Sequence, residues 1–221
     1  MPFFDDLVQQ TATERQALVS VPQLRQGLAG AISRAVYIEY LTQAYHHVRH
    51  TVPLLRLARQ RVAGRPLIAQ AIDEYIFEET GHEHWVLDDI SAAGGDAAAA
   101  AASTPHAATA AMVNCAYERV GRGNPLSMFG MVYVLEGTSV AMASQGAAAI
   151  QVHLGLPDSA FRYLKSHGAL DQQHLRFFEG LMNTVEDPED QREIISMARA
   201  MFRLFADLFR SIDTGERHAT A

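Results

Sequence analysis

Apolar side chains recur at the spacing of an amphipathic helix through most of this 221-residue chain. Val, Ile, Thr and aromatic residues nowhere alternate with polar residues for long enough to indicate a strand. We therefore expect an all-α fold, built as a single domain over residues 1–221, with about seven or eight helices. The expected helices cover roughly residues 3–18, 24–62, 66–90, 105–121, 126–152, 158–184 and 188–212.

Proline and glycine indicate where these helices bend or end. Pro53 lies inside an apolar helical pattern, which predicts a kink or break near residues 50–53. The alanine-rich stretch "AAGGDAAAAAASTP" predicts a low-complexity loop at about 92–104 with some helical character. Asp187 and Pro188 are typical of an N-cap followed by the first residue of a helix. The tail, about 213–221, is expected to be frayed.

The composition excludes several classes of function. Eighteen Lys and Arg residues against 25 Asp and Glu residues give a net charge of −7, with no basic stripe, so we expect no nucleic-acid partner. Charges interrupt every apolar run before about 18 residues, and the start "MPFFDDLVQQ" lacks a basic and apolar leader. We therefore expect no membrane span and no signal peptide. Cys115 is the single cysteine, which fits a reducing cytoplasm.

Polar residues interrupt the core-facing stripe of the helix expected at 158–184. In "SHGALDQQHLRFF", His167, Asp171 and His174 follow one another at steps of four and three, which places them on one face. Apolar residues continue the same face on both sides. Because burying unpaired polar groups costs several kcal/mol, something must compensate for this trio.

Two further helices repeat the pattern. Glu79 and His82 occupy the apolar stripe of the helix expected at 66–90, and Glu136 is the lone charge in "MFGMVYVLEGTSVAMASQGAAAI". A helix that is apolar nearly all round is expected to be central, which would bury Glu136 deeply. Glu39 lies on a weaker stripe of the first long helix and is an additional candidate.

A single buried histidine is more often a hydrogen-bonded core residue than a ligand, and Glu136 alone could be a protonated core acid. Taken together, however, the set contains three carboxylates and three imidazoles, the usual ligands of iron, manganese or zinc. Six ligands exceed the needs of a closed zinc site and suit two metals that share carboxylates in a helix bundle. The predicted metal ligands are Glu79, His82, Glu136, His167, Asp171 and His174, with Glu39 as an extra.

The segments "EETGHEHWVLDDI", "YVLEG" and "HGALDQQH", in this order, resemble the heme-oxygenase-like di-iron oxidases and oxygenases. These iron-containing redox enzymes are relatives of the TenA and PqqC proteins and share their helical fold. The resemblance implies two iron ions, the second labile, which activate O₂ to oxidise a small organic metabolite with the help of an electron donor. It also implies that Glu136 bridges or ligates, that His82 and His174 supply nitrogens, and that Asp171 and Glu79 offset the metal charge.

The resemblance makes Glu136 and Glu79 the residues expected to act in catalysis and leaves a homodimer as the expected assembly. Several members of the family carry an acid seven residues before the first histidine, and this chain has Tyr75 there. Substrate is expected to contact a pocket wall formed by Met128, Met131, Val132, Tyr133, Tyr163 and Phe178.

Four alternatives stay open at this point. A heme-binding enzyme would use His46 or His47 as the axial ligand, and manganese could replace iron. A TenA-like thiaminase would need a cysteine near Glu136, whereas Cys115 lies on the preceding helix. A PqqC-like cofactor-free oxidase would need a basic pocket, whereas the expected core is acidic. A non-catalytic metal-binding helical bundle is the fourth alternative.

Overall fold

The computed structural model describes residues 1–62 and 64–214, and within α11 it describes the backbone but not the side chains of residues 167–174. The described residues form α-helices joined by loops and two short 3₁₀ turns, without a strand, which confirms the all-α prediction. The helices are α1 (Phe3–Gln10), α2 (Ala12–Val19), α3 (Pro22–Leu28), α4 (Arg34–Val48), α5 (Thr51–Arg61), α6 (Pro66–Glu79), α7 (His82–Ala92), α8 (Ala97–Ala102), α9 (Ala107–Arg122), α10 (Met128–Leu154), α11 (Arg162–Met182) and α12 (Pro188–Arg210).

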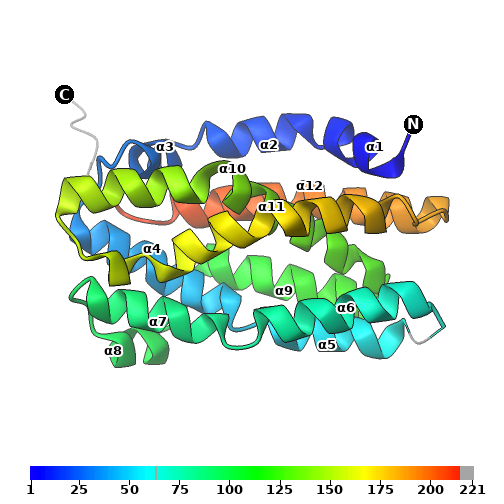
Figure 1. The fold of residues 1–221 in the computed structure, drawn as a ribbon, viewed down its shortest axis with the longest axis horizontal. Coiled ribbons are helices and arrows are strands. Elements are labelled where there is room, and N and C mark those ends of the chain that lie inside the picture. Colours follow the sequence, from blue (N-terminus) through cyan, green and yellow to red (C-terminus); the bar gives the residue numbers. More distant parts are fainter. Residues whose placement is uncertain (63, 215–221) are drawn as a thin grey trace.

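The helices lie roughly along the long axis of the molecule (Figure 1). In this view α1, α2 and α3 run along one side and α5 to α8 along the opposite side, with α10, α11 and α12 between them. Helix α10 packs mainly against α11 and α12 and also contacts α3. It is therefore the central helix, as its apolar composition predicts.

There are more helices than the predicted seven or eight because three expected helices are divided. The expected helix 3–18 is interrupted at Thr11, and 24–62 is divided by a loop containing Gly30 and again at residues 49–50. The second of these breaks lies beside the position that Pro53 predicts. The expected helix 66–90 ends at Glu79, and α7 begins at His82 after Gly81. Gly30 and Gly81 have φ angles of 71° and 96°, which other residues adopt only with strain.

The ends of other helices agree with the sequence. Asp187 caps α12 by accepting a hydrogen bond from the Glu189 amide, and Pro188 is its first residue. The alanine-rich stretch forms the short helix α8 inside the predicted loop, capped by Asp96. The predicted frayed tail falls largely on residues 215–221, outside the described part of the chain.

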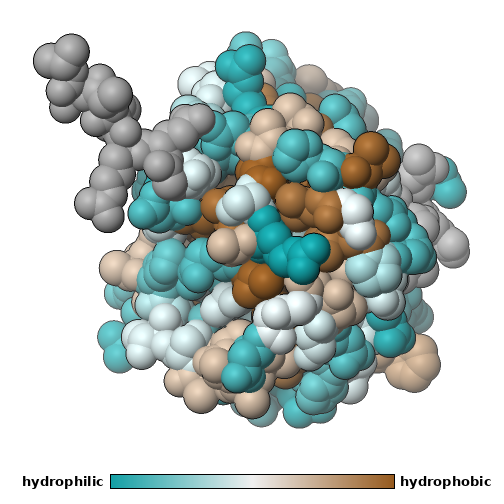
Figure 2. All heavy atoms as spheres, turned by 90° about the vertical axis from the view of Figure 1, so that its left-hand side faces the viewer, coloured by the Kyte–Doolittle hydropathy of each residue, from teal (hydrophilic) through white to brown (hydrophobic). Residues whose placement is uncertain are grey.

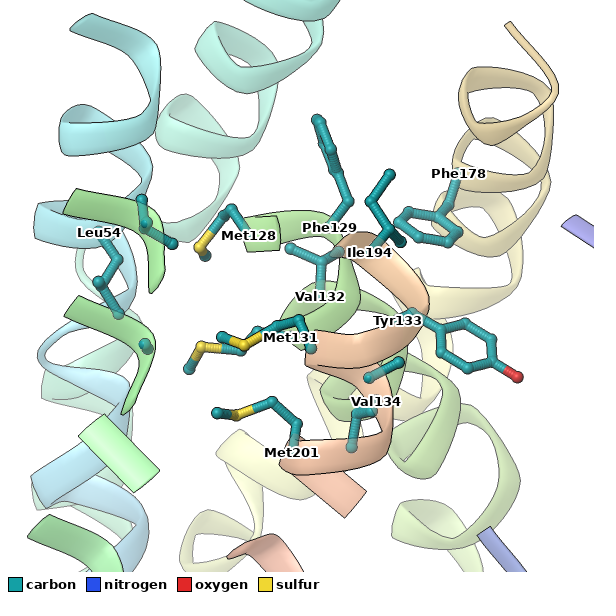
Figure 3. Packing of buried hydrophobic residues seen from close by; sticks show 14 of the residues in the cluster. Leu54, Met128, Phe129, Met131, Val132, Tyr133, Val134, Phe178, Ile194 and Met201 are labelled. Carbon is teal, nitrogen blue, oxygen red and sulfur yellow. The ribbon is translucent and has the colours of Figure 1, made fainter. Parts of the chain in front are cut away.

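The main core forms where α10 meets α12 and α5. Met128, Met131 and Met201 point toward Leu54, while Tyr133 and Phe178 lie together on the other side (Figure 3). The segment Pro125–Leu154 is the one described stretch that is long and apolar enough to cross a membrane, yet 56% of its most apolar part is buried against the rest of the protein. Its composition is that of a core helix.

Helices α10 and α12 approach very closely at Gly130. A Cβ atom placed on Gly130 would lie 2.4 Å from the carbonyl oxygen of Ile194 and 2.8 Å from the amide nitrogen of Ala198. These are backbone atoms, which cannot move aside as a flexible side chain can. The absence of a side chain at Gly130 therefore sets the distance between the two central helices.

Candidate metal centre

Glu79 and His82 meet across the break between α6 and α7. Glu79 ends α6, Thr80 is extended with a ψ of 116°, and Gly81 turns the chain in the left-handed region. The Nδ1 atom of His82 lies 3.1 Å from Oε2 of Glu79, and the two side chains are 5% and 13% exposed. The pair therefore comes together as predicted, but the turn brings it together, and not the register of one continuous helix.

An aromatic wall supports His82. Its ring stacks on Trp85 with a centroid separation of 4.0 Å. The guanidinium of Arg162, at the start of α11, lies 4.6 Å from the Trp85 ring. Cation–π contacts of this kind are worth roughly 0.5–1 kcal/mol at exposed sites. The stack orients the imidazole and couples it to the helix that carries the His167, Asp171 and His174 motif.

Glu136 is buried in the first half of α10, with 9% of its surface exposed. Tyr75, from α6, lies close to it. Burial raises the pKa of the Tyr75 phenol above its ordinary value, and the charges of Glu136, Glu78 and Glu79 raise it further. The phenol therefore keeps its proton beside the carboxylate at physiological pH.

Tyr75, Glu79 and Glu136 line one cavity, together with His47 from α4. Its empty volume is about 1330 Å³, including the solvent at its open mouth. Most of the other described lining residues are apolar, and none of them is Lys or Arg. The two carboxylates and the imidazole of His47 thus face an interior space that excludes much of the water.

The second half of the predicted ligand set belongs to α11. His167, Asp171 and His174 lie outside the described side chains, although the α11 backbone that carries them packs against α10 and α7. Among the described residues, no group of three or more His, Cys, Asp or Glu side chains is close enough to hold a metal ion. The described residues contribute the Glu79–His82 pair and Glu136.

Glu39, the additional candidate, does not line this cavity. Its Oε1 atom lies 3.1 Å from Nε2 of His106 and accepts a hydrogen bond from Gln43 at 2.9 Å. Gln43 in turn accepts hydrogen bonds from the His106 amide and the Thr109 hydroxyl. Glu39 thus belongs to a polar network that joins α4 to the start of α9.

The two adjacent histidines of α4 have different surroundings. Nε2 of His46 lies 2.8 Å from the Ser103 hydroxyl, at the end of α8. His47 faces the cavity, with its ring edge-on to Phe205 at 6.0 Å. The sequence names both residues as axial-ligand candidates, and only His47 is placed for such a role.

The predicted pocket wall is right in part. Met128, Met131, Val132 and Tyr163 line the cavity. Tyr133 and Phe178 stack on each other with centroids 6.1 Å apart, and the Tyr133 hydroxyl accepts a hydrogen bond from Arg15. These two aromatic residues instead anchor the N-terminal helices, whose packing the sequence alone does not indicate.

Asp89 is a buried polar residue that sequence reasoning missed. It projects from α7, and its Oδ1 and Oδ2 atoms accept hydrogen bonds from the backbone amides of Arg162 and Tyr163 at 3.0 and 2.9 Å. These amides open α11, so Asp89 caps a helix distant in sequence and fixes α11 against α7. An aspartate one helical turn after a valine gives no local signal of such a cap.

Asp89 is expected to make stability depend on pH. Burial raises the pKa of its carboxyl from 3.8 to about 6, although the two amide donors act in the opposite direction. The folded state therefore binds the proton more tightly, and the stability that protonation contributes is fully present below about pH 4 and lost as the pH rises through about 6. Asp89→Asn has no titrating carboxyl at this position and therefore lacks this pH-dependent contribution. The wild type should thus lose stability relative to the variant as the pH rises from about 4 to about 6. Urea unfolding at a series of pH values measures the difference, and a pH-independent value would contradict the expectation.

The arrangement of helices defines the class of protein. A domain of unknown function with a heme oxygenase-like fold from Shewanella denitrificans superposes with a TM-score of 0.86 and 24% identity, over 95% of this chain and 91% of that one. Heme oxygenase-1 from the cyanobacterium Synechocystis, in complex with heme, superposes with a TM-score of 0.77 and 13% identity, over 97% of this chain and 94% of that one. A TenA homologue from Pseudomonas syringae superposes with a TM-score of 0.76 and 10% identity, over 94% of this chain and 91% of that one. The chain therefore has the heme oxygenase-like fold.

The family follows from the sequence match. A family model described as iron-containing redox enzyme matches residues 38–206, so the chain belongs to this family. The matched region includes every predicted metal ligand. No curated protein sequence matches the chain.

Proposed function

We propose that this protein is a non-heme, di-iron oxidase or oxygenase that uses O₂ to oxidise a small organic molecule. The observation that carries the proposal is the placement of two carboxylates, the buried Glu136 and the nearly buried Glu79, in the wall of one largely apolar cavity, with His82 beside Glu79. An electron donor, a cytoplasmic location and a homodimer belong to the same proposal.

The chemistry of these donors fits iron. Carboxylate oxygens and imidazole nitrogens are typical ligands of iron, and a bound cation offsets the cost of burying the two acids. Glu79, His82 and Glu136 would hold iron together with His167, Asp171 and His174, which follow on α11. Reduced iron would supply the electrons with which O₂ is activated.

The residues of this chain would then have distinct tasks. Glu79, whose Oε2 atom lies 3.1 Å from Nδ1 of His82, would orient this imidazole in addition to offsetting the metal charge. Tyr75 keeps a phenolic proton beside Glu136, where it can serve as a hydrogen-bond donor. The apolar wall binds substrate and excludes water from the reacting groups.

The proposal is tested by anaerobic loading with Fe(II), followed by exposure to O₂. We expect about two irons per chain and a transient visible absorbance after mixing with O₂. His82→Ala should lose iron and the absorbance. His84→Ala is the matched control, since His84 lies on the same helix with its side chain 73% exposed and should leave both unchanged. Equal iron content in the two variants, or no iron uptake by the wild type, would contradict the proposal.

Heme binding is the second candidate, and the position of His47 in the cavity wall favours it. The charges of the cavity oppose it, because the described lining residues include two carboxylates and no Lys or Arg to pair with the heme propionates. Titration with hemin separates the two candidates. A Soret band that is lost in His47→Ala and retained in His46→Ala would establish heme binding in place of the di-iron proposal.

A further inference from the structure

The cavity is elongated along α10. Its wall includes residues from Met128 to Ile150 of this helix. Ile150 lies 14 residues beyond Glu136, which at the rise of an α-helix is about 21 Å along the axis. Met128 lies eight residues before Glu136, or about 12 Å away in the other direction. Glu136 therefore divides the space into a short arm and a long arm.

The long arm is largely apolar, with Thr138 and Ser139 of α10 as hydroxyl-bearing residues close to Glu136. Its wall is formed by Leu28 from α3, Ile32 from the following loop, and Met142, Ala143 and Ile150 from α10. The face of the molecule at this end carries hydrophobic side chains gathered near its middle, among polar ones (Figure 2). No described residue of the wall is Lys or Arg, so the described wall offers no positive charge to an anionic group.

Gly27, on α3, forms part of the wall of the long arm. A Cβ atom placed on Gly27 would have no atom within 4 Å, so a side chain at this position would extend into open space. The nearby Gly146 differs, because its Cβ would be in ordinary contact with Leu28 at 3.6 Å. A larger residue at Gly27 would therefore meet no atom at its Cβ, and because Gly27 lines the cavity, this is the position of the wall chosen to test whether added bulk shortens the space.

We propose that the ligand of this cavity is an elongated, largely apolar molecule with one polar end, and that Gly27 sets the length of the apolar part that fits. The polar end lies at Glu79 and Glu136, and the apolar part follows α10 toward α3. This deepens the proposed function, since it names the class of molecule presented to the iron site. Binding of the apolar part does not itself require iron and can be measured in metal-free protein.

The test is calorimetric binding of a series of 1-alkanols, from 1-hexanol to 1-dodecanol, to the metal-free protein. For the wild type, affinity should rise about fourfold for each methylene that becomes buried. In Gly27→Leu the short alkanols should bind as before, whereas the longest should lose at least about tenfold because their last methylenes are excluded. Circular dichroism verifies that each variant is folded.

Gly180→Leu is the matched control. It replaces another helical glycine with open surroundings, on the exposed side of α11 and away from the cavity, and should retain the wild-type profile. An affinity of the wild type that does not depend on chain length would overturn the ligand class. An equal loss at every chain length in Gly27→Leu, or the same loss in Gly180→Leu, would overturn the role of Gly27. Failure of iron loading would leave these binding results standing, so the two proposals fail separately.

Discussion

Glu136→Gln is expected to lower iron affinity by at least about 100-fold, because loss of even an outer-shell partner of a metal ligand costs about 10- to 100-fold. The substitution keeps the size of the side chain and removes the charge that would offset the metal. Glu136 has 9% of its surface exposed and lies in the cavity wall, so the lost charge would be one that faces the interior. Iron per chain after anaerobic loading, measured against Fe(II) concentration, gives the affinity.

The control for this variant is Glu118→Gln. Glu118 is an exposed acid on α9, so its removal changes the net charge equally without touching the cavity. It should bind iron as the wild type does. If Glu136→Gln retained wild-type affinity while remaining folded, Glu136 would be a core acid and the centre would have to be built without it.

Gly130→Ala is expected to destabilise the fold by about 3 kcal/mol, the upper end of the usual cost of overpacking a core. The added methyl group would meet the carbonyl oxygen of Ile194 at 2.4 Å and Cβ of Met197 at 2.8 Å. To accept it, α10 and α12 would have to separate along a contact that organises the main core. The free energy of unfolding in urea measures the loss.

Gly137→Ala provides the comparison on the same helix. No atom lies within 4 Å of a Cβ placed there, so the change should only improve helix propensity, by up to about 1 kcal/mol. The free energy of unfolding should therefore fall in Gly130→Ala and rise slightly in Gly137→Ala. Destabilisation of similar size in both would mean that α10 depends on glycine for another reason than its distance from α12.

Much of the fold can be predicted from the periodicity of apolar residues. The central position of α10 follows from its single charge, and the start of α12 follows from Asp187 and Pro188. The divisions at Gly30 and Gly81 are harder to predict, because an isolated glycine inside a helical pattern can either be tolerated or end the helix. Only the packing of α3 and of α6 against their neighbours decides between these outcomes.

Residues of the candidate site could be predicted where a polar residue interrupts an apolar stripe that faces the core. Glu79, His82 and Glu136 interrupt apolar stripes, and each is buried or nearly so in the structure. Glu39 shows the limit of the same reasoning, because its stripe is weak and His106 pairs with it away from the cavity. Asp89 shows the opposite limit, since its partners are backbone amides more than 70 residues away.

The interruption between α6 and α7 bears on how such a centre can vary between relatives. Tyr75 and Glu79 lie one helical turn apart near the end of α6, and both face the cavity. Because His82 begins a separate helix, its position is not tied to the register of α6. An acid at either position of α6 would reach the same space. A carboxylate could thus be shifted by a full turn of α6 and still face this cavity, without any change in the position of His82.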